Sequence, residues 1–169
     1  AVAAYLNQLH GVNLGTERVT ISASGMQGLT LAAQTLVALG DRVVMIAPDW
    51  PNIAAAFAIA GGRVEKVALG VQNGRWTLDL DRLIDALTPD TRCLMMNSPN
   101  NPTGSIYPEN LLLEIFKLCQ SRGIWLILVE TFRDFLPLDL DLPLRFFAQE
   151  KWQGTLIQLY SFSKSYCLP

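Results

Sequence analysis

The chain has 169 residues, of which 50% are hydrophobic and 17% are charged, and its formal net charge is −2. This composition excludes a disordered chain, and the scattered lysines and arginines form no basic patch of the kind that nucleic-acid binding requires. The longest apolar runs, Ile53 to Ala60 and Ile124 to Val129, are far shorter than the roughly 20 residues that span a bilayer. We therefore expect one soluble domain that has neither nucleic acid nor a membrane as a partner.

Cysteine and histidine are too few and too scattered to form a metal site. Cys93, Cys119 and Cys167 form no C-x-x-C pair, and His10 is the single histidine, so no bound metal is expected. The three thiols are typical of a reduced, cytoplasmic protein. The sequence begins at Ala1 rather than at a methionine and stops abruptly at its last residue, which we interpret as a fragment of a longer chain.

In chain order, short β-rich runs alternate with longer helical patterns. The β-rich runs predict six strands: Val19–Ala23, Val43–Ala47, Arg63–Val67, Cys93–Asn97, Ile124–Val129 and Thr155–Tyr160. The helical patterns predict four helices: Met26–Leu39, Ile53–Ala60, Leu80–Leu87 and Pro108–Arg122. Several strands are apolar at successive positions, as expected when helices cover both faces of a sheet. The prediction is an α/β fold, a three-layer αβα sandwich with a mainly parallel central sheet.

Residues between these segments fit the same alternation. Gly40, Gly61 and Gly123 stand where glycine commonly closes a helix. Asp79 precedes another helix and is suited to cap its amino end. Leu138–Pro143 alternates Leu, Asp and Pro and is the clearest predicted loop.

Four clusters of polar or aromatic residues directly follow predicted strands. They are Ser24–Gln27, Pro48–Trp50, Asn97–Gly104 and Ser161–Lys164. In open parallel sheets, ligands bind beyond the carboxyl ends of the strands. We therefore expect these clusters to converge on one edge of the sheet and to form the functional site.

The first two clusters allow a functional and a structural interpretation. Ser24–Gln27 joins a strand to a helix, so its backbone N–H groups and the helix dipole would hold a phosphate, unless the segment is only a capped turn. Trp50 lies between Pro48 and Pro51, where its ring would stack on a planar ligand, unless it is a core tryptophan.

The other two clusters carry candidate reactive and hydrogen-bonding groups. Asn97–Gly104 is dense in turn-forming residues, and the Asn101 amide would donate to a bound oxygen, unless the turn holds no ligand. Lys164 follows an apolar strand among serines, where partial burial would favour a nucleophilic amine, unless it is an exposed surface lysine. Serine hydroxyls beside an imine-forming lysine are what pyridoxal phosphate requires.

Two of these runs carry a resemblance to a known family. Asn-x-Pro-x-Asn-Pro-Thr-Gly at Asn97–Gly104 and Ser-x-Ser-Lys at Ser161–Lys164 are similar, in order and separation, to motifs of the class I/II aminotransferases, pyridoxal-phosphate enzymes of fold type I. The resemblance covers nearly the whole chain. It implies that residues 1–169 form the pyridoxal-phosphate-binding large domain, with a sheet of seven strands of which one is antiparallel. It also implies that the amino-terminal arm and the small domain are missing.

The resemblance assigns roles to individual residues. Lys164 would be the catalytic residue and would form the Schiff base with the cofactor. Trp50 would stack on the pyridine ring, and Asn101 would bond its phenolic oxygen. The phosphate would be held by Gly25, Met26, Gln27, Ser161 and Ser163.

The sequence departs from the family where a strand should end in Asp-Glu-x-Tyr. It has Val129-Glu130-Thr131-Phe132 there. The family aspartate pairs with the protonated pyridine nitrogen, and valine offers neither charge nor hydrogen bond. Phe132 lacks the hydroxyl of the tyrosine. Glu130 is a poor substitute for the aspartate because adjacent residues of a strand point to opposite faces.

The resemblance implies an aminotransferase that moves an amino group between an amino acid and a 2-oxo acid, acting as a homodimer. Two alternatives stay open. The departures at Val129 and Phe132 favour a cofactor-binding or structural remnant without turnover. Another pyridoxal-phosphate chemistry, such as β-elimination, would use the same lysine.

Overall fold

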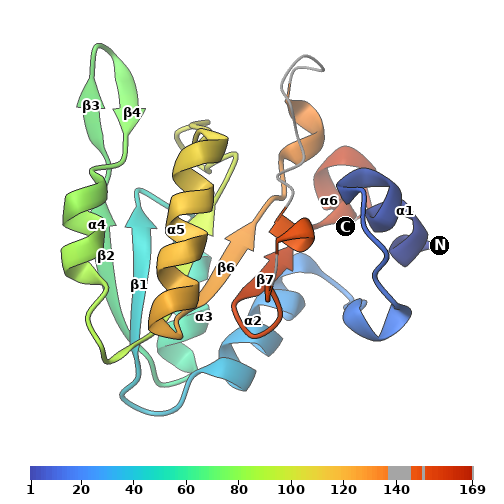
Figure 1. Ribbon diagram of the computed structural model, residues 1–169, viewed down its shortest axis with the longest axis horizontal. Coiled ribbons are helices and arrows are strands. Elements are labelled where there is room, and N and C mark those ends of the chain that lie inside the picture. The colour runs from blue at the N-terminus through green and yellow to red at the C-terminus, as the bar shows by residue number, and fades with distance from the viewer. Residues whose placement is uncertain (137–145, 150, 169) are drawn as a thin grey trace.

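A five-stranded parallel sheet forms the centre of the protein (Figure 1). The computed structural model describes residues 1–136, 146–149 and 151–168. The strand order is β2-β1-β5-β6-β7, and every neighbouring pair is parallel. The strands are β1 Arg42–Ala47, β2 Arg63–Ala68, β5 Thr91–Asn97, β6 Trp125–Val129 and β7 Leu156–Leu159. Five of the six predicted strands are thus confirmed.

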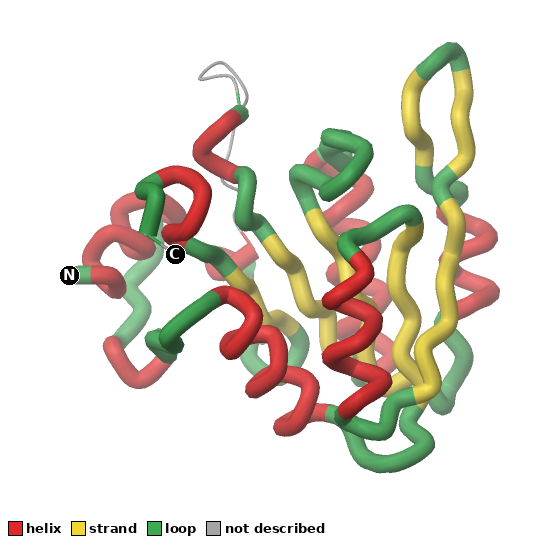
Figure 2. Tube along the Cα trace, turned by 180° about the vertical axis from the view of Figure 1, so that it is seen from behind, coloured by secondary structure: helices red, strands yellow, loops and turns green. Residues whose placement is uncertain are grey.

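Helices cover both faces of this sheet, as the apolar strands predict (Figures 1 and 2). The helices α2 Gly25–Leu36 and α3 Pro51–Ile59 pack on one face, and α4 Leu80–Ala86 and α5 Glu109–Arg122 pack on the other. Side chains alternate along each strand, so Val43 and Met45 contact the first pair while Val44 and Ile46 contact the second. The three-layer αβα sandwich is confirmed.

The predicted helix ends are mostly confirmed. Asp79 Oδ1 accepts a hydrogen bond from the Arg82 backbone N–H at 3.1 Å and caps α4, and Gly123 closes α5 in the left-handed region with φ 66°. The prediction for Gly40 was wrong. Helix α2 ends at Leu36 because Val37 is already extended, so Gly40 belongs to the turn that leads into β1.

The predicted strand Val19–Ala23 does not form. A strand needs a neighbour with which to pair its backbone, and this segment pairs with no strand among the described residues. It leaves the short helix η1 Thr16–Arg18 and leads into α2, with Ile21 67% exposed. The expected seven-stranded sheet with one antiparallel member is also not found, because the described part of the chain supplies five parallel strands. The predicted loop Leu138–Pro143 lies outside the described residues.

Six further elements complete the described structure. An antiparallel hairpin, β3 Gly70–Gln72 with β4 Arg75–Thr77, projects beyond the central sheet (Figure 1). Near the chain ends lie α1 Val2–His10 and α6 Phe162–Ser165. Two short helices, η2 Arg133–Phe135 and η3 Phe146–Ala148, lie between β6 and β7 in the sequence. No helix in the described residues is both long and apolar enough to cross a membrane.

The strand order places a switch point between β1 and β5. From β1 the chain moves outward to β2 and then returns to the other side of β1, where β5, β6 and β7 follow. The loops after β1 and β5 therefore lead to opposite faces of the sheet and leave a crevice between them. This crevice is where the predicted ligand-binding clusters should meet.

Candidate functional site

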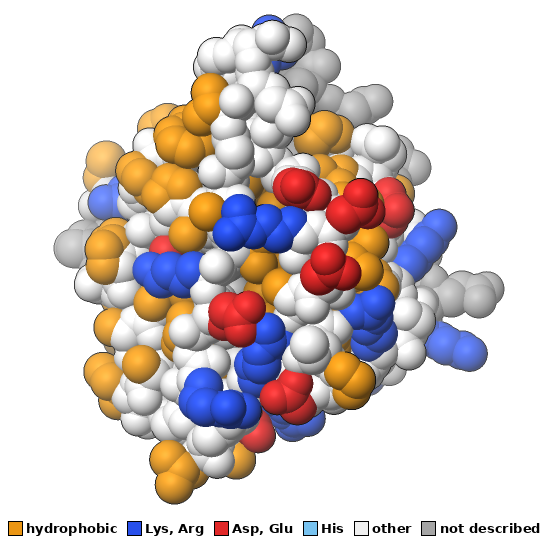
Figure 3. Space-filling view, turned by 90° about the vertical axis from the view of Figure 1, so that its left-hand side faces the viewer, with side chains coloured by type: hydrophobic (Ala, Val, Ile, Leu, Met, Phe, Trp, Pro, Cys, Tyr) orange, Lys and Arg blue, Asp and Glu red, His pale blue; other side chains and the backbone are white. Residues whose placement is uncertain are grey.

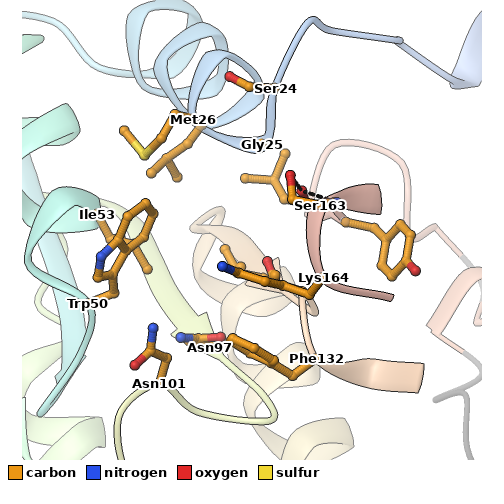
Figure 4. Close-up of a pocket in the computed structure, with 16 residues that line it drawn as sticks. Ser24, Gly25, Met26, Trp50, Ile53, Asn97, Asn101, Phe132, Ser163 and Lys164 are labelled. Atoms are coloured by element: carbon orange, nitrogen blue, oxygen red, sulfur yellow. Dashed lines mark hydrogen bonds between the residues drawn. The ribbon is translucent and has the colours of Figure 1, made fainter. Parts of the chain in front are cut away.

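A cavity of about 350 Å³ lies at the carboxyl edge of the sheet. The amino end of α2 and the segments that follow β1, β5, β6 and β7 surround it (Figure 4). The structure brings most of the predicted cofactor-binding residues together here: Gly25, Met26, Trp50, Asn101, Ser161, Ser163 and Lys164. These residues are far apart in the sequence and meet only through the parallel sheet.

Gln27 is the predicted cofactor-binding residue that does not line the cavity. Its backbone N–H donates to Ser24 Oγ at 3.1 Å, and its side-chain Oε1 accepts from the Ala23 N–H at 2.6 Å. Both groups therefore stabilise the turn into α2. The two interpretations of Ser24–Gln27 are compatible, because the capped turn also forms one wall of the cavity.

One corner of the cavity is built from hydrogen-bond donors. The first N–H groups of α2, those of Gly25 and Met26, have no acceptor within the helix by position. A Cβ atom at Gly25 would lie 3.2 Å from Ser161 Cβ, so glycine allows the helix to start this close to Ser161. Ser161 Oγ accepts from the Ser163 N–H at 3.2 Å and donates to Ser163 Oγ at 2.9 Å. The amides of Gly25 and Met26 and the hydroxyls of Ser161 and Ser163 form what we call the donor corner. This arrangement at a helix amino end suits an anionic phosphate.

Trp50 and Asn101 lie on another side of the cavity (Figure 4). Trp50 immediately precedes α3 and is 38% exposed, so the alternative of a core tryptophan was wrong. Asn101 is half-buried in the loop after β5. An aromatic face and an amide donor are thus available to a planar ligand with a polar substituent.

Lys164 extends from α6 into the space between these walls (Figure 4). The expectation of partial burial was wrong, because Lys164 is exposed. Helix α6 is a single turn with no fully buried residue, and its Ser163 and Ser165 are partly buried whereas Lys164 is exposed. Among the described residues that line the cavity, Lys164 carries the only charged side chain.

The end of β6 contributes an apolar wall. Val129 and Phe132 both line the cavity. Glu130 is buried and does not line it, as the alternation along a strand predicts: its Oε2 accepts from Gln158 Nε2 and, at 3.3 Å, from Arg133 Nη1. Burial raises the pKa of Glu130 to about 7, although Arg133 and Gln158 act to lower it.

The sequence interpretation gave no role to three polar residues that line the cavity, Asn97, Thr131 and Tyr160. Asn97 belongs to a cluster that the rule for the carboxyl ends of strands had already selected, and the same rule would have identified Thr131 and Tyr160, which follow β6 and β7. Burial, together with the hydrogen bond that Tyr160 donates to Asp134, raises the pKa of Tyr160 to about 12, so its phenol stays neutral. The described residues contain no group of three or more His, Cys, Asp or Glu side chains that could hold a metal ion.

Comparison with known proteins identifies the family. The family model for class I and II aminotransferases matches residues 1–169. The chain is 30% identical to the aspartate/prephenate aminotransferase of Thermus thermophilus over 136 residues, which cover 80% of this chain and 35% of that enzyme. It is 34% identical to the threonine-phosphate decarboxylase of Salmonella typhimurium over 128 residues, which cover 76% of this chain and 34% of that enzyme. The chain belongs to the class I and II aminotransferase family.

Solved structures support the same assignment. A Thermus thermophilus aspartate aminotransferase variant superposes with a TM-score of 0.88 at 25% identity, covering 99% of this chain and 45% of that one. The fold is therefore that of an aminotransferase large domain. The chain spans less than half the length of these relatives.

The residues of the cavity fit most of pyridoxal phosphate, the cofactor of this family. The donor corner suits its phosphate, Trp50 suits its ring face, and Lys164 offers the amine that the cofactor aldehyde requires. The apolar wall at Val129 does not fit a protonated ring nitrogen, which needs an acceptor or a negative charge.

Proposed function

We propose that this chain is the cofactor-binding part of a pyridoxal-phosphate-dependent aminotransferase, which transfers an amino group between an amino acid and a 2-oxo acid. The observation that carries the proposal is the position of Lys164 in one cavity with Trp50, Asn101 and the donor corner. The relative from Thermus thermophilus, named an aspartate/prephenate aminotransferase, also supports it.

Each side chain has a part in this reaction. The amides at the start of α2 and the hydroxyls of Ser161 and Ser163 would hold the phosphate, Trp50 would orient the ring, and Asn101 would donate to the phenolic oxygen. Lys164 Nζ would hold the cofactor at its aldehyde carbon and, as a free amine, would move a proton to and from the substrate α-carbon. When bound, the cofactor supplies the electron sink for this transfer.

The wider proposal concerns the whole protein. We infer that residues 1–169 are its cofactor-binding large domain, which an amino-terminal arm and a small domain complete. The lengths of its relatives support this, since the chain covers 35% of one and 45% of another. We also propose a cytoplasmic homodimer. The free thiols of Cys93 and Cys119, which are buried, support the location.

The test is covalent trapping. Pyridoxal phosphate is added to the chain, the adduct is reduced with borohydride, and the modified peptide is mapped by mass spectrometry. We expect modification at Lys164 and none in Lys164→Ala, whereas Lys117→Ala, which changes an exposed lysine on α5, should not alter it. Reduced cofactor on Lys117 or Lys151 would contradict the proposal. In the whole protein, formation of a 2-oxo acid from an amino acid distinguishes transamination from decarboxylation, the reaction named for the Salmonella relative.

A second candidate function is a cofactor-binding remnant without turnover. The apolar wall of Val129 and Phe132 favours it, because neither side chain offers a charge or a hydrogen bond to the cofactor ring. Such a protein would still bind cofactor at Lys164 but would form no 2-oxo acid. Binding and turnover therefore have to be measured separately.

A further inference from the structure

Asn100 is a buried polar residue in the loop between β5 and α5, and it does not line the cavity. It is 3% exposed. Its backbone N–H donates to the Ser105 carbonyl at 2.9 Å, and its own carbonyl accepts from the Gly104 N–H at 2.8 Å. These two bonds close the turn that carries Asn101.

The side chain of Asn100 makes three hydrogen bonds. Its Oδ1 accepts from the Thr103 N–H at 3.1 Å and from Thr103 Oγ1 at 2.8 Å. Its Nδ2 donates to the Pro48 carbonyl at 3.2 Å. Pro48 stands two residues before Trp50, so one amide joins the loop of Asn101 to the loop of Trp50.

This connection lies where the sheet itself provides none. The pairing of β1 with β5 stops at Met45 opposite Met95. Beyond that point, β1 pairs with β2 as far as Ala47, and β5 pairs with β6 as far as Asn97. The two strands therefore separate at the switch point, and the bond from Asn100 Nδ2 to the Pro48 carbonyl spans the opening.

We propose that Asn100 is a positioning residue that sets the separation of Trp50 and Asn101 across the cofactor cavity. The inference rests on the proposed function, since it assigns those two residues to one ligand. A buried amide held by three hydrogen bonds permits few alternative arrangements. Losing its donor frees the Trp50 loop to shift relative to the Asn101 loop.

The substitution Asn100→Asp tests this with little change of shape. The carboxylate keeps acceptors for Thr103 but places an oxygen against the Pro48 carbonyl, where a donor is required. Two variants serve as controls. Asn110→Asp makes the same change at an exposed position of α5, and Thr103→Val disturbs the same loop but leaves the bond to Pro48 in place.

The experiment loads each full-length variant of the 169-residue chain with pyridoxal phosphate. It measures cofactor affinity, the circular dichroism induced in the cofactor's visible band, and borohydride trapping on Lys164. We expect Asn100→Asp to remain trapped at Lys164, to lose most of the induced band and to bind cofactor about tenfold more weakly. Both controls should retain the band. An unchanged band and affinity in a folded Asn100→Asp variant would overturn the inference.

A second measurement tests the inference even if the Asn100→Asp variant fails to fold. In the unmodified chain without cofactor, hydrogen exchange of the Asn100 side-chain amide is followed by NMR and compared with that of exposed Asn110. Slow exchange at Asn100 supports the connection to Pro48, and exchange as fast as at Asn110 overturns it. This result does not depend on cofactor binding, so it separates failure of the inference from failure of the proposed function, which a lack of trapping at Lys164 would show.

Discussion

Val129 gives the cavity an apolar wall at the end of β6, where the family resemblance places an aspartate. An acidic side chain there would hold the cofactor's ring nitrogen in its protonated form and strengthen the electron sink. In the whole protein we expect Val129→Asp to raise the rate of amino-group transfer by about ten- to a hundredfold, the value of one charge-assisted hydrogen bond. Phe132→Tyr should add a smaller gain.

The measurement is the single-turnover conversion of bound cofactor to its amine form, compared across the four combinations of these two positions. Trapping on Lys164 in every variant controls for cofactor loading. If the unmodified protein already reacts as fast as Val129→Asp, the second candidate function, a cofactor-binding remnant without turnover, is wrong. Another group then controls the protonation of the ring nitrogen.

Glu130 makes stability depend on pH. Because burial raises its folded pKa to about 7 from an ordinary value of 4.5, the fold favours the protonated form. The resulting stabilisation is complete below pH 4.5 and is lost as the pH rises through 7, by up to roughly 3 kcal/mol. Glu130→Gln should remove this dependence. Urea unfolding at pH 5 and pH 8 measures it, with the exposed Glu114→Gln on α5 as the control. Equal pH dependence in Glu130→Gln and the unmodified chain would contradict the assignment.

At the scale of an element, the start of α2 lies so close to Ser161 that a larger residue at Gly25 would disturb the donor corner. In Gly25→Ala the new Cβ would lie 3.2 Å from Ser161 Cβ and 3.3 Å from its Oγ, so the helix has to shift by a few tenths of an ångström. We expect cofactor binding to weaken about tenfold, a loss comparable to one hydrogen bond.

The control for this variant is Gly28→Ala, which changes the same helix at a position that does not line the cavity. In both variants the higher helix propensity of alanine is opposed by a new Cβ contact of 3.2 Å, with Ser161 Cβ at Gly25 and with Ser22 Oγ at Gly28, so the two changes in stability should be similar. Titration with pyridoxal phosphate gives the affinity, and urea unfolding gives the stability. Equal affinities of the two variants would show that the close approach of α2 to Ser161 does not matter for binding.

The sequence predicted correctly those elements whose hydrophobic pattern indicates burial in the sheet. Strands β1, β5 and β6 are apolar at successive positions, and their assignment needed no tertiary information. Val19–Ala23 has similar β propensity but no strand beside it, and propensity does not supply a partner. The β3–β4 hairpin was missed although Asn73-Gly74 marks a two-residue turn, with φ values of 51° and 73°.

The candidate site was predictable to the extent that short motifs mark it. The two motifs identified Asn101, Ser161 and Lys164, which do line the cavity. The exposure of Lys164 was not predictable, because it depends on which other parts of the chain cover a one-turn helix. The bond from Asn100 to Pro48 was not predictable either, since it joins residues that only the strand order brings together.

At the scale of the whole molecule, the two edges of the sheet differ. The β2 edge carries Arg63, Glu65 and Lys66, and Figure 3 shows basic and acidic side chains interspersed over that side. Such charges discourage pairing with a further strand. The β7 edge, Leu156–Leu159, has no charged residue. The charges of β2 therefore protect that edge against pairing with another chain, whereas Leu156–Leu159 carries no such charge.

Exposed apolar residues also favour association of the chain with other copies of itself. Leu39 is 92% exposed and Ile59 is 82% exposed. We expect the chain to associate with rising concentration, because water is excluded when such surfaces meet. Sedimentation velocity measures the association, and a double variant, Leu39→Ser with Ile59→Ser, should weaken it. A monodisperse monomer at all concentrations, without binding of a dye for apolar surface, would contradict this expectation.

The position of Lys164 also has a consequence for biosynthesis. The walls of the cavity that contain Ser24, Trp50 and Asn101 leave the ribosome well before β7 and α6. Chains emerge from the amino end and fold in that order, so the lysine is the last of these groups to arrive. Under the proposed function, the growing chain would present the start of α2, Trp50 and Asn101 early, whereas Ser161, Ser163 and the amine of Lys164 would arrive together at the end. On that proposal, covalent attachment can therefore begin only after Lys164 has been synthesised.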